Sequence, residues 1–204
     1  MSLCECGCGR EIPEHVGRGR PRRFFNAACR VRANRAETFP VPAEMVAANR
    51  WVRWQRIVRG DGTTKNPRTI DGRQASSTDP TTWSPFADAR ISTIGDGMGF
   101  VLGDGFACID LDHCYDARNH LTDWAKMLIA PVQGKTYIET SPSGDGLHIW
   151  GRAPERTGLK VRGIMNAEAY SRARYITYTG RAWHKSPAIL ADLTFLFDVI
   201  ARLS

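Results

Sequence analysis

Two short β-forming segments separated by only three turn residues constrain the fold of this chain more than any other feature. The segments are Met98–Leu102 and Phe106–Asp112, and Gly103-Asp104-Gly105 lies between them. A turn this short is typical of two antiparallel strands, because a crossover between parallel strands needs a dozen or more residues. The sequence therefore predicts antiparallel hairpins and not a regular series of βαβ units.

Further segments around this hairpin also have strand or helix patterns. Strands are expected at Trp51–Val58, Thr136–Thr140, Leu147–Gly151 and Arg174–Thr179. Helices are expected at Pro80–Ile91, at Leu121–Ala130 and over residues 187–204, where Pro187 precedes apolar residues at helical spacing. Together these segments predict an α+β domain, in which a mixed or antiparallel sheet is flanked by helices.

The composition of the chain divides it into four blocks. Residues 1–36 are rich in Cys, Gly and Arg and contain too few apolar side chains to form a core. Residues 37–48 contain two prolines and are predicted to be a linker. The main domain is expected over residues 49–186, and residues 187–204 are expected to close it as a helix. A chain of 204 residues has room for one well-cored domain and a short appendage.

Positive charge is concentrated in the first block. Residues 1–36 hold eight arginines and three glutamates, so they supply +5 of the formal net charge of +7. Such a concentration indicates a phosphate-binding surface, and therefore a nucleic acid or a nucleotide as partner. The sequence has no signal peptide and no apolar run near the ~18 residues that cross a bilayer. We therefore expect a cytoplasmic protein with reduced thiols and no membrane partner.

The segment 107–113 alternates between polar and apolar side chains. Strand geometry places Asp110 and Asp112 on one face and Ile109 and Leu111 on the opposite, buried face. Two carboxylates this close repel each other unless a cation lies between them, and hard divalent cations prefer carboxylate oxygens. The pair is therefore a candidate metal site. The alternative is a strand end that exposes two solvated aspartates.

A second motif is the turn Ser141-Pro142-Ser143-Gly144-Asp145-Gly146. Its two glycines and its proline make a tight turn whose backbone N–H groups can face an anion, which makes Ser143 and Gly144 candidate phosphate contacts. His148 lies just inside the following strand, where it can contact a phosphate oxygen. The alternative is an ordinary hairpin turn with a structural histidine.

A third motif begins at Glu168 and continues into the predicted strand Arg174–Thr179. Glu168 can complete a cluster of three carboxylates, and its alternative is an ordinary exposed glutamate on a surface strand. The cation of Arg174 and the hydroxyl of Thr177 can meet phosphate or sugar groups.

The order of these motifs resembles the N-terminal domain of bifunctional DNA primase/polymerases, members of the archaeo-eukaryotic primase superfamily that are frequent in phages and plasmids. The resemblance covers about residues 49–181. It rests on Asp-x-Asp after a Gly-Phe-Val-Leu strand, on Thr-Tyr-x-Glu-x-Ser-Pro-Ser-Gly-x-Gly-x-His, and on Glu-x-Tyr followed by Arg-Tyr-x-Thr-x-Thr-Gly. Upstream, Trp51-x-x-Trp54, Lys65-x-Pro67 and Thr82-Trp83-x-x-Phe86 are also similar to this family.

The resemblance implies a fold, an activity and a role for each motif. It implies an RRM-like catalytic core that performs template-directed nucleotidyl transfer in phage or plasmid DNA replication, on a single-stranded DNA template with NTPs or dNTPs. Asp110, Asp112 and Glu168 would hold Mg²⁺ or Mn²⁺, and His148 would contact the incoming triphosphate. The same resemblance makes Lys65 and Arg174 nucleotide or template contacts, beside Ser143, Gly144 and Thr177.

The resemblance also implies a replication partner. Many relatives continue into a helicase or another C-terminal module, whereas this sequence ends at Ser204. A separate helicase is therefore an expected partner.

Four cysteines lie within the basic N-terminal block: Cys4, Cys6, Cys8 and Cys29. Four thiolates can close a tetrahedral structural zinc site, which would order a segment that lacks an apolar core. The pattern resembles small treble-clef-like or zinc-ribbon-like fingers, but Phe25 stands where one cysteine is expected. The ligands are therefore these four cysteines, or three of them with His15. The alternative is a basic tail with reduced thiols.

Two other functions remain open at the level of sequence. An acidic cluster with a histidine also cuts phosphodiesters, so a metal-dependent nuclease is one alternative. The other is a non-catalytic, replication-associated DNA-binding module with a vestigial site. Incorporation of nucleotides, as opposed to loss of labelled DNA, separates the enzymatic alternatives.

Overall fold

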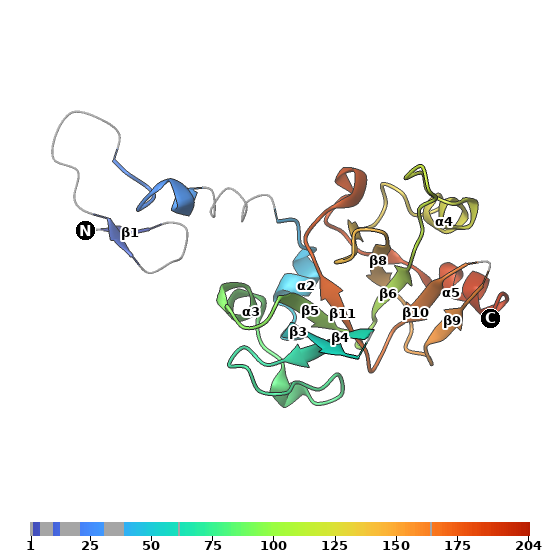
Figure 1. The fold of residues 1–204 in the computed structure, drawn as a ribbon, viewed down its shortest axis with the longest axis horizontal. Helices are drawn as coiled ribbons and strands as arrows, with labels where there is room; N and C mark the ends of the chain where they lie inside the picture. Colours follow the sequence, from blue (N-terminus) through green and yellow to red (C-terminus); the bar gives the residue numbers. More distant parts are fainter. Residues whose placement is uncertain (1, 5–9, 13–20, 31–38, 61, 164) are drawn as a thin grey trace. The chain divides into compact units, whose positions relative to one another are not determined.

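The computed structural model describes residues 2–4, 10–12, 21–30, 39–60, 62–163 and 165–204 (Figure 1). The chain divides into two compact units, Met1–Pro40 and Val41–Ser204. The first unit is small and the second contains the two large sheets, so the elements that carry the predicted chemistry lie in the second unit.

In the first unit, β1 (Ser2–Leu3) pairs antiparallel with β2 (Glu11–Ile12), and residues 27–30 are helical. Cys4 and Cys29 are buried in one small apolar cluster with Ile12. Two of the predicted zinc ligands, far apart in the sequence, therefore belong to the same cluster. Cys6, Cys8 and His15 lie outside the described residues.

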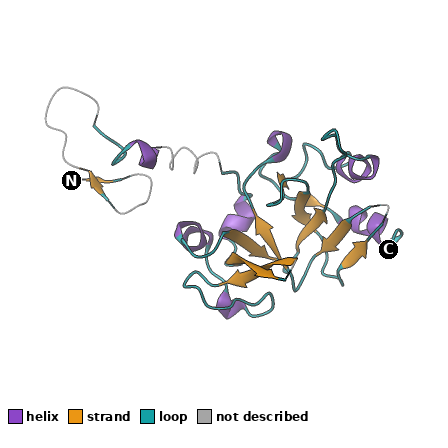
Figure 2. Cartoon of the chain, in the orientation of Figure 1, coloured by secondary structure: helices purple, strands orange, loops and turns teal. Residues whose placement is uncertain are grey.

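The second unit is built on two sheets, which Figure 2 shows as separate groups of strands. Its strands are β3 (Trp51–Arg59), β4 (Gly62–Arg68), β5 (Gly97–Val101), β6 (Phe106–Leu111), β7 (Ile138–Thr140), β8 (Leu147–Arg152), β9 (Leu159–Val161), β10 (Ala167–Tyr170), β11 (Tyr175–Tyr178) and β12 (Ala191–Asp192). The four-stranded sheet has the order β11-β5-β3-β4, and the six-stranded sheet has the order β12-β8-β6-β10-β9, with β7 also beside β8. All pairings are antiparallel except that of β12 with β8. The predicted α+β class is confirmed.

Short helices complete the second unit: α2 (Ala43–Ala47), α3 (Phe86–Ile91), α4 (Asp123–Ile129), α5 (Thr194–Ala201) and the 3₁₀ turns Pro80–Thr82 and Trp183–Lys185. Residues of α4 and α5 pack on one face of the six-stranded sheet, where they form a core with Ala107, Ile109 and Leu111 of β6. None of the described helices combines the length and the apolar character that crossing a membrane requires.

The predicted hairpin between β5 and β6 is wrong, although both segments are strands. The Gly103-Asp104-Gly105 turn passes the chain from the four-stranded sheet to the six-stranded sheet, and the two strands share only the isolated bridge between Gly103 and Phe106. The cause is that β5 is an interior strand, which pairs with β3 along one edge and with β11 along the other. Neither edge of β5 is therefore available to β6, and just past the strand the Arg50 guanidinium donates to the carbonyls of Val101 and Leu102 at 2.9 and 3.1 Å.

Two predicted helices are shorter than expected. The segment Pro80–Ile91 is interrupted because Ser84 pairs with Trp51 through two backbone hydrogen bonds, at 2.8 and 3.1 Å. The C-terminal helix begins at Thr194 and not near Pro187, because β12 pairs with β8 just before it. Strands β4, β9, β10 and β12 lie outside the predicted strand ranges.

Aromatic side chains join the two sheets. Phe100 of β5 lies edge-on to Phe106 of β6 and to Trp150 of β8, with ring centroids 5.0 and 6.2 Å apart. Each such contact contributes about 0.5–1.5 kcal/mol beyond the burial of its area. Trp150 lies two residues after His148 on β8, so this aromatic contact fixes the position of the sheet face that carries the polar side chains.

Candidate active site

One face of the six-stranded sheet carries a row of ionisable side chains across four neighbouring strands. Asp110 of β6 lies opposite Glu168 of β10 on one side and opposite His148 of β8 on the other. Glu139 of β7 lies opposite His148. Directly opposed residues of antiparallel strands point to the same face, with Cβ atoms about 4.5–5.5 Å apart. The sequence predicted three members of this row, and it assigned no role to Glu139.

Asp110 has the least satisfied side chain of the row. Its Oδ1 atom is buried and has no hydrogen-bond partner among the described residues. The nearest ionisable nitrogen, His148 Nε2, is 3.6 Å away, which is too long for a hydrogen bond. Burial raises the pKa of Asp110; the charge of Asp112 adds to this rise, and the charges of His148, Lys65 and Arg174 oppose it. A buried carboxylate oxygen without a donor is an atom that a cation would satisfy.

Asp112 follows the end of β6 and is partly exposed, and its backbone N–H donates to the Asn166 carbonyl at 2.9 Å. Its charge acts on Asp110, so the two carboxylates of the predicted pair are electrostatically coupled. Their hard oxygen donors and the unsatisfied Oδ1 of Asp110 fit a divalent cation such as Mg²⁺ or Mn²⁺.

Glu168 is engaged by basic side chains. Its carboxylate pairs with the guanidinium of Arg162 and with Lys160 Nζ, the latter at 3.5 Å, and it accepts a hydrogen bond from the Tyr170 hydroxyl. Within the described ranges, no three Asp, Glu, His or Cys side chains are gathered closely enough to hold a metal ion together. The structure therefore places Glu168 opposite Asp110, but the Glu168 carboxylate forms ion pairs with Arg162 and Lys160.

His148 is 2% exposed and lies between two carboxylates. Its Nδ1 is 3.0 Å from Glu139 Oε1, and its Nε2 faces Asp110. Burial lowers the pKa of His148, but the two carboxylates raise it by more, so that the net shift is upward although Lys65 opposes it. The histidine of the second motif is therefore a polar member of the site and not an apolar core residue.

The turn between β7 and β8 is held by its own polar groups. Ser141 N donates to the Gly146 carbonyl at 2.9 Å, and Gly144 N donates to the Ser141 carbonyl at 3.1 Å. The hydroxyl of Ser143 contacts the hydroxyl of Ser141 at 2.9 Å and donates to Asp145. Gly144 has a φ of +94° and open space where a side chain would stand, so its backbone can be approached closely.

The predicted nucleotide contacts from other elements differ in their placement. Lys65 of β4 and Arg174, just before β11, both lie close enough to Asp110 for their charges to lower its pKa. The Arg174 guanidinium lies 4.9 Å from the ring centroid of Tyr170. Thr177 is buried on β11 opposite Gly99. The structure thus brings the two cations to the carboxylates and places the threonine inside the protein.

Comparisons with known proteins indicate a family for the region that contains this row. The sequence profile described as "Bifunctional DNA primase/polymerase, N-terminal" matches residues 31–183, a range that includes the whole row. A protein named "DNA Primase-polymerase" from Nitratiruptor phage NrS-1 is 36% identical over 143 residues, which cover 65% of this chain and 19% of that protein. The similar region thus spans about a fifth of the relative's length.

Proposed function

This chain belongs to the family of bifunctional DNA primase/polymerase N-terminal domains, and we propose that it performs template-directed nucleotidyl transfer in phage or plasmid replication. Members of this family generally use divalent metal ions. The observation that carries the proposal is the buried, unpartnered Oδ1 of Asp110, which lies within the matched range, beside Asp112 and opposite both Glu168 and His148.

Each side chain has a role in this proposal. Asp110 and Asp112 would hold Mg²⁺ or Mn²⁺, and Glu168, which now pairs with Arg162 and Lys160, would be a further ligand. Metal ions held there would supply activation of an attacking 3′-hydroxyl and neutralisation of the leaving pyrophosphate. His148 presents Nε2 to a phosphate oxygen of the incoming NTP or dNTP. The protein then acts mainly by positioning its substrates and by neutralising charge.

Two cations on neighbouring elements extend the proposed site beyond the row. Lys65 and Arg174 act electrostatically on Asp110, and they therefore supply positive charge where a triphosphate or a template phosphate would lie. The turn that contains Ser143 and Gly144 offers a close approach to the same phosphates, since nothing occupies the space beside Gly144.

A gel assay separates this function from its alternatives. The full chain is incubated with a labelled primer on a single-stranded DNA template, with dNTPs and Mg²⁺ or Mn²⁺. Extension that follows the template sequence supports the proposal. Shortening of the labelled primer without extension would favour a metal-dependent nuclease. A labelled primer that is bound but keeps its length would favour a non-catalytic binding module.

Replacing Arg162 should strengthen metal binding. Arg162→Ala removes one of the two cations that pair with Oε1 of Glu168 and leaves only Lys160, at 3.5 Å. The Arg162 side chain is 51% exposed, so solvent screening limits its pairing energy to about 1 kcal/mol, or roughly fivefold in affinity. Mn²⁺ titrations followed by electron paramagnetic resonance should show this tighter binding. Arg156→Ala, which removes an arginine paired with Asp198, is the matched control, and equal Mn²⁺ affinities for both variants would contradict the role of Glu168.

We also propose that the N-terminal unit binds structural zinc through Cys4, Cys6, Cys8 and Cys29, or through three of them with His15. Cys4 and Cys29 lie in one buried cluster, which supports a shared role. Purified protein should carry about one zinc per chain, and Cys29→Ser should lose it, whereas Cys114→Ser, at a buried thiol in the second unit, should retain it. Elemental analysis measures the difference. Absence of zinc from the wild type and from both variants would contradict the proposal, and would mean that this unit is a basic segment whose thiols bind no metal.

A further inference from the structure

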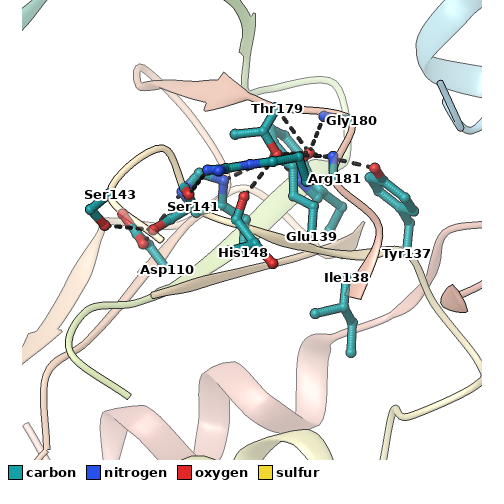
Figure 3. A network of polar contacts seen from close by, with 12 residues as sticks. Asp110, Tyr137, Ile138, Glu139, Ser141, Ser143, His148, Thr179, Gly180 and Arg181 are labelled. Atoms are coloured by element: carbon teal, nitrogen blue, oxygen red, sulfur yellow. Dashed lines mark hydrogen bonds and ion pairs between the residues drawn. The ribbon is translucent and has the colours of Figure 1, made fainter. Parts of the chain in front are cut away.

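Glu139 is a fully buried carboxylate that accepts hydrogen bonds at both oxygens (Figure 3). Its Oε1 lies 3.0 Å from His148 Nδ1 and 3.2 Å from Trp150 Nε1. Its Oε2 accepts from the backbone N–H groups of Gly180 at 2.8 Å and Thr179 at 3.0 Å. A buried carboxylate is stable only when donors satisfy it, and Glu139 has such donors on each oxygen.

These donors determine which nitrogen of His148 carries a proton. An indole N–H and a backbone N–H can only donate, so both oxygens of Glu139 act as acceptors. Oε1 of Glu139 then serves as acceptor for the imidazole as well, an arrangement that is satisfied when Nδ1 of His148 carries the proton of this contact. The other ring nitrogen, Nε2, is consequently turned toward Asp110, 3.6 Å from its Oδ1.

The anchoring of Glu139 extends beyond its own hairpin. Thr179 and Gly180 follow β11, which belongs to the four-stranded sheet, whereas Glu139 and His148 belong to the six-stranded sheet. The segment after Gly180 also returns to the site, because the Arg181 side chain donates to the Ser141 carbonyl. Figure 3 shows Glu139 between His148 and this segment. The orientation of the imidazole is thus determined by residues of both sheets.

We propose that Glu139 is a positioning residue that holds the His148 ring so that Nε2, and not Nδ1, meets the triphosphate of the incoming nucleotide. This inference rests on the proposed function. An imidazole without such a partner can rotate by half a turn and exchange its two nitrogens, whereas a fixed partner on one nitrogen selects the orientation of the ring. Glu139 does not reach the substrate itself, so it acts through His148.

A double-mutant cycle on nucleotide binding tests this role. Wild-type protein, Glu139→Gln, His148→Ala and the double variant are titrated with a fluorescent deoxynucleoside triphosphate and Mn²⁺. Loss of a residue that orients a binding histidine costs about 10–100-fold. Glu139→Gln should therefore weaken binding at least about tenfold in the wild-type background and by less than about twofold in the His148→Ala background. Glu44→Gln is the matched control: it makes the same substitution at a glutamate whose side chain is 56% exposed and which pairs only loosely with Arg152, at 3.8 Å, so binding should be nearly unchanged.

The outcomes separate this proposal from the proposed function. Equal losses from Glu139→Gln in both backgrounds would overturn the positioning role and would leave the function in place. Wild-type protein that binds no nucleotide, or His148→Ala that binds it normally, would overturn the proposed role of His148 and this inference with it.

A measurement on the wild-type full chain decides the orientation even if Glu139→Gln fails to fold. Long-range ¹H–¹⁵N correlation spectra of the imidazoles, assigned by the loss of one signal set in His148→Ala, report which nitrogen is protonated. We expect a proton on Nδ1 of His148. An unprotonated Nδ1 would overturn the proposal.

Discussion

Asp110→Asn should lower the rate of nucleotide incorporation by a hundredfold or more, about 3 kcal/mol of barrier, and should leave the protein folded. The substitution keeps the size of the side chain and removes a charged metal ligand. It also removes a charge from a side chain that is 21% exposed but whose Oδ1 is buried without a hydrogen-bond partner among the described residues, beside the charge of Asp112. In metal-free buffer the thermal midpoint should therefore stay the same or rise, by about 2–4 °C for each 1 kcal/mol of relieved burial cost.

The measurement combines primer extension with thermal unfolding in the presence of a chelator. Asp123→Asn is the matched control, because this aspartate lies on α4 with its side chain 98% exposed and pairs only weakly with Lys126. It should change neither quantity. A variant at Asp110 that extends primers at the normal rate, or one that unfolds well below the wild type, would mean that Asp110 serves the fold and not the chemistry.

His148→Ala should raise the apparent KM for the nucleotide by about 10–100-fold, as expected for loss of one charge-assisted hydrogen bond of about 1.5–3 kcal/mol. The affinity for single-stranded DNA should change much less, because the proposed role of His148 is limited to the incoming triphosphate. Steady-state extension at varied dNTP concentration gives the KM, and fluorescence anisotropy with labelled DNA gives the second affinity.

His120→Ala is the control for His148→Ala, since the His120 side chain is 73% exposed and pairs only loosely with Asp116, at 3.9 Å. It should leave both quantities unchanged. An unchanged KM in His148→Ala would mean that His148 has a structural role and does not contact the nucleotide. Equal losses of DNA and nucleotide affinity would place it on the template path instead.

Local alternation was enough to predict which side chains of β6 face the apolar core. Polar and apolar side chains alternate along β6, and the structure places Ile109 and Leu111 in the core beneath α4 and α5 as this pattern predicts. The carboxylate pair follows from the same alternation, because it depends only on the period of one strand.

The partners of Asp110 depend on pairing between strands that are distant in the sequence. Glu168 lies opposite Asp110 because β10 pairs with β6, and β10 was not among the predicted strands. The engagement of Glu168 by Arg162 likewise requires β9 to pair with β10. Neither pairing has a local signal, because register between distant strands is set by the packing of the whole sheet.

Glu139 could have been found from the sequence. The turn of residues 141–146 predicts a hairpin, and its register pairs Thr140 with Leu147 and therefore Glu139 with His148. A glutamate opposite a candidate catalytic histidine would then have stood out. The hairpin expected between β5 and β6 failed for the opposite reason, since β3 and β11, which are both distant from β5 in the sequence, occupy its two edges.

The central claim is that Asp110 and Asp112 hold the catalytic metal ions of a nucleotidyl transferase. A crystal structure of the full chain with Mn²⁺ and a deoxynucleoside triphosphate tests it most directly, because anomalous scattering locates the ions without reference to the protein. We expect a peak within about 2.0–2.3 Å of carboxylate oxygens of both aspartates, and a second peak about 3.5–4 Å from the first, with the triphosphate on the His148 side. Manganese bound elsewhere, with both aspartates free of metal, would contradict the claim.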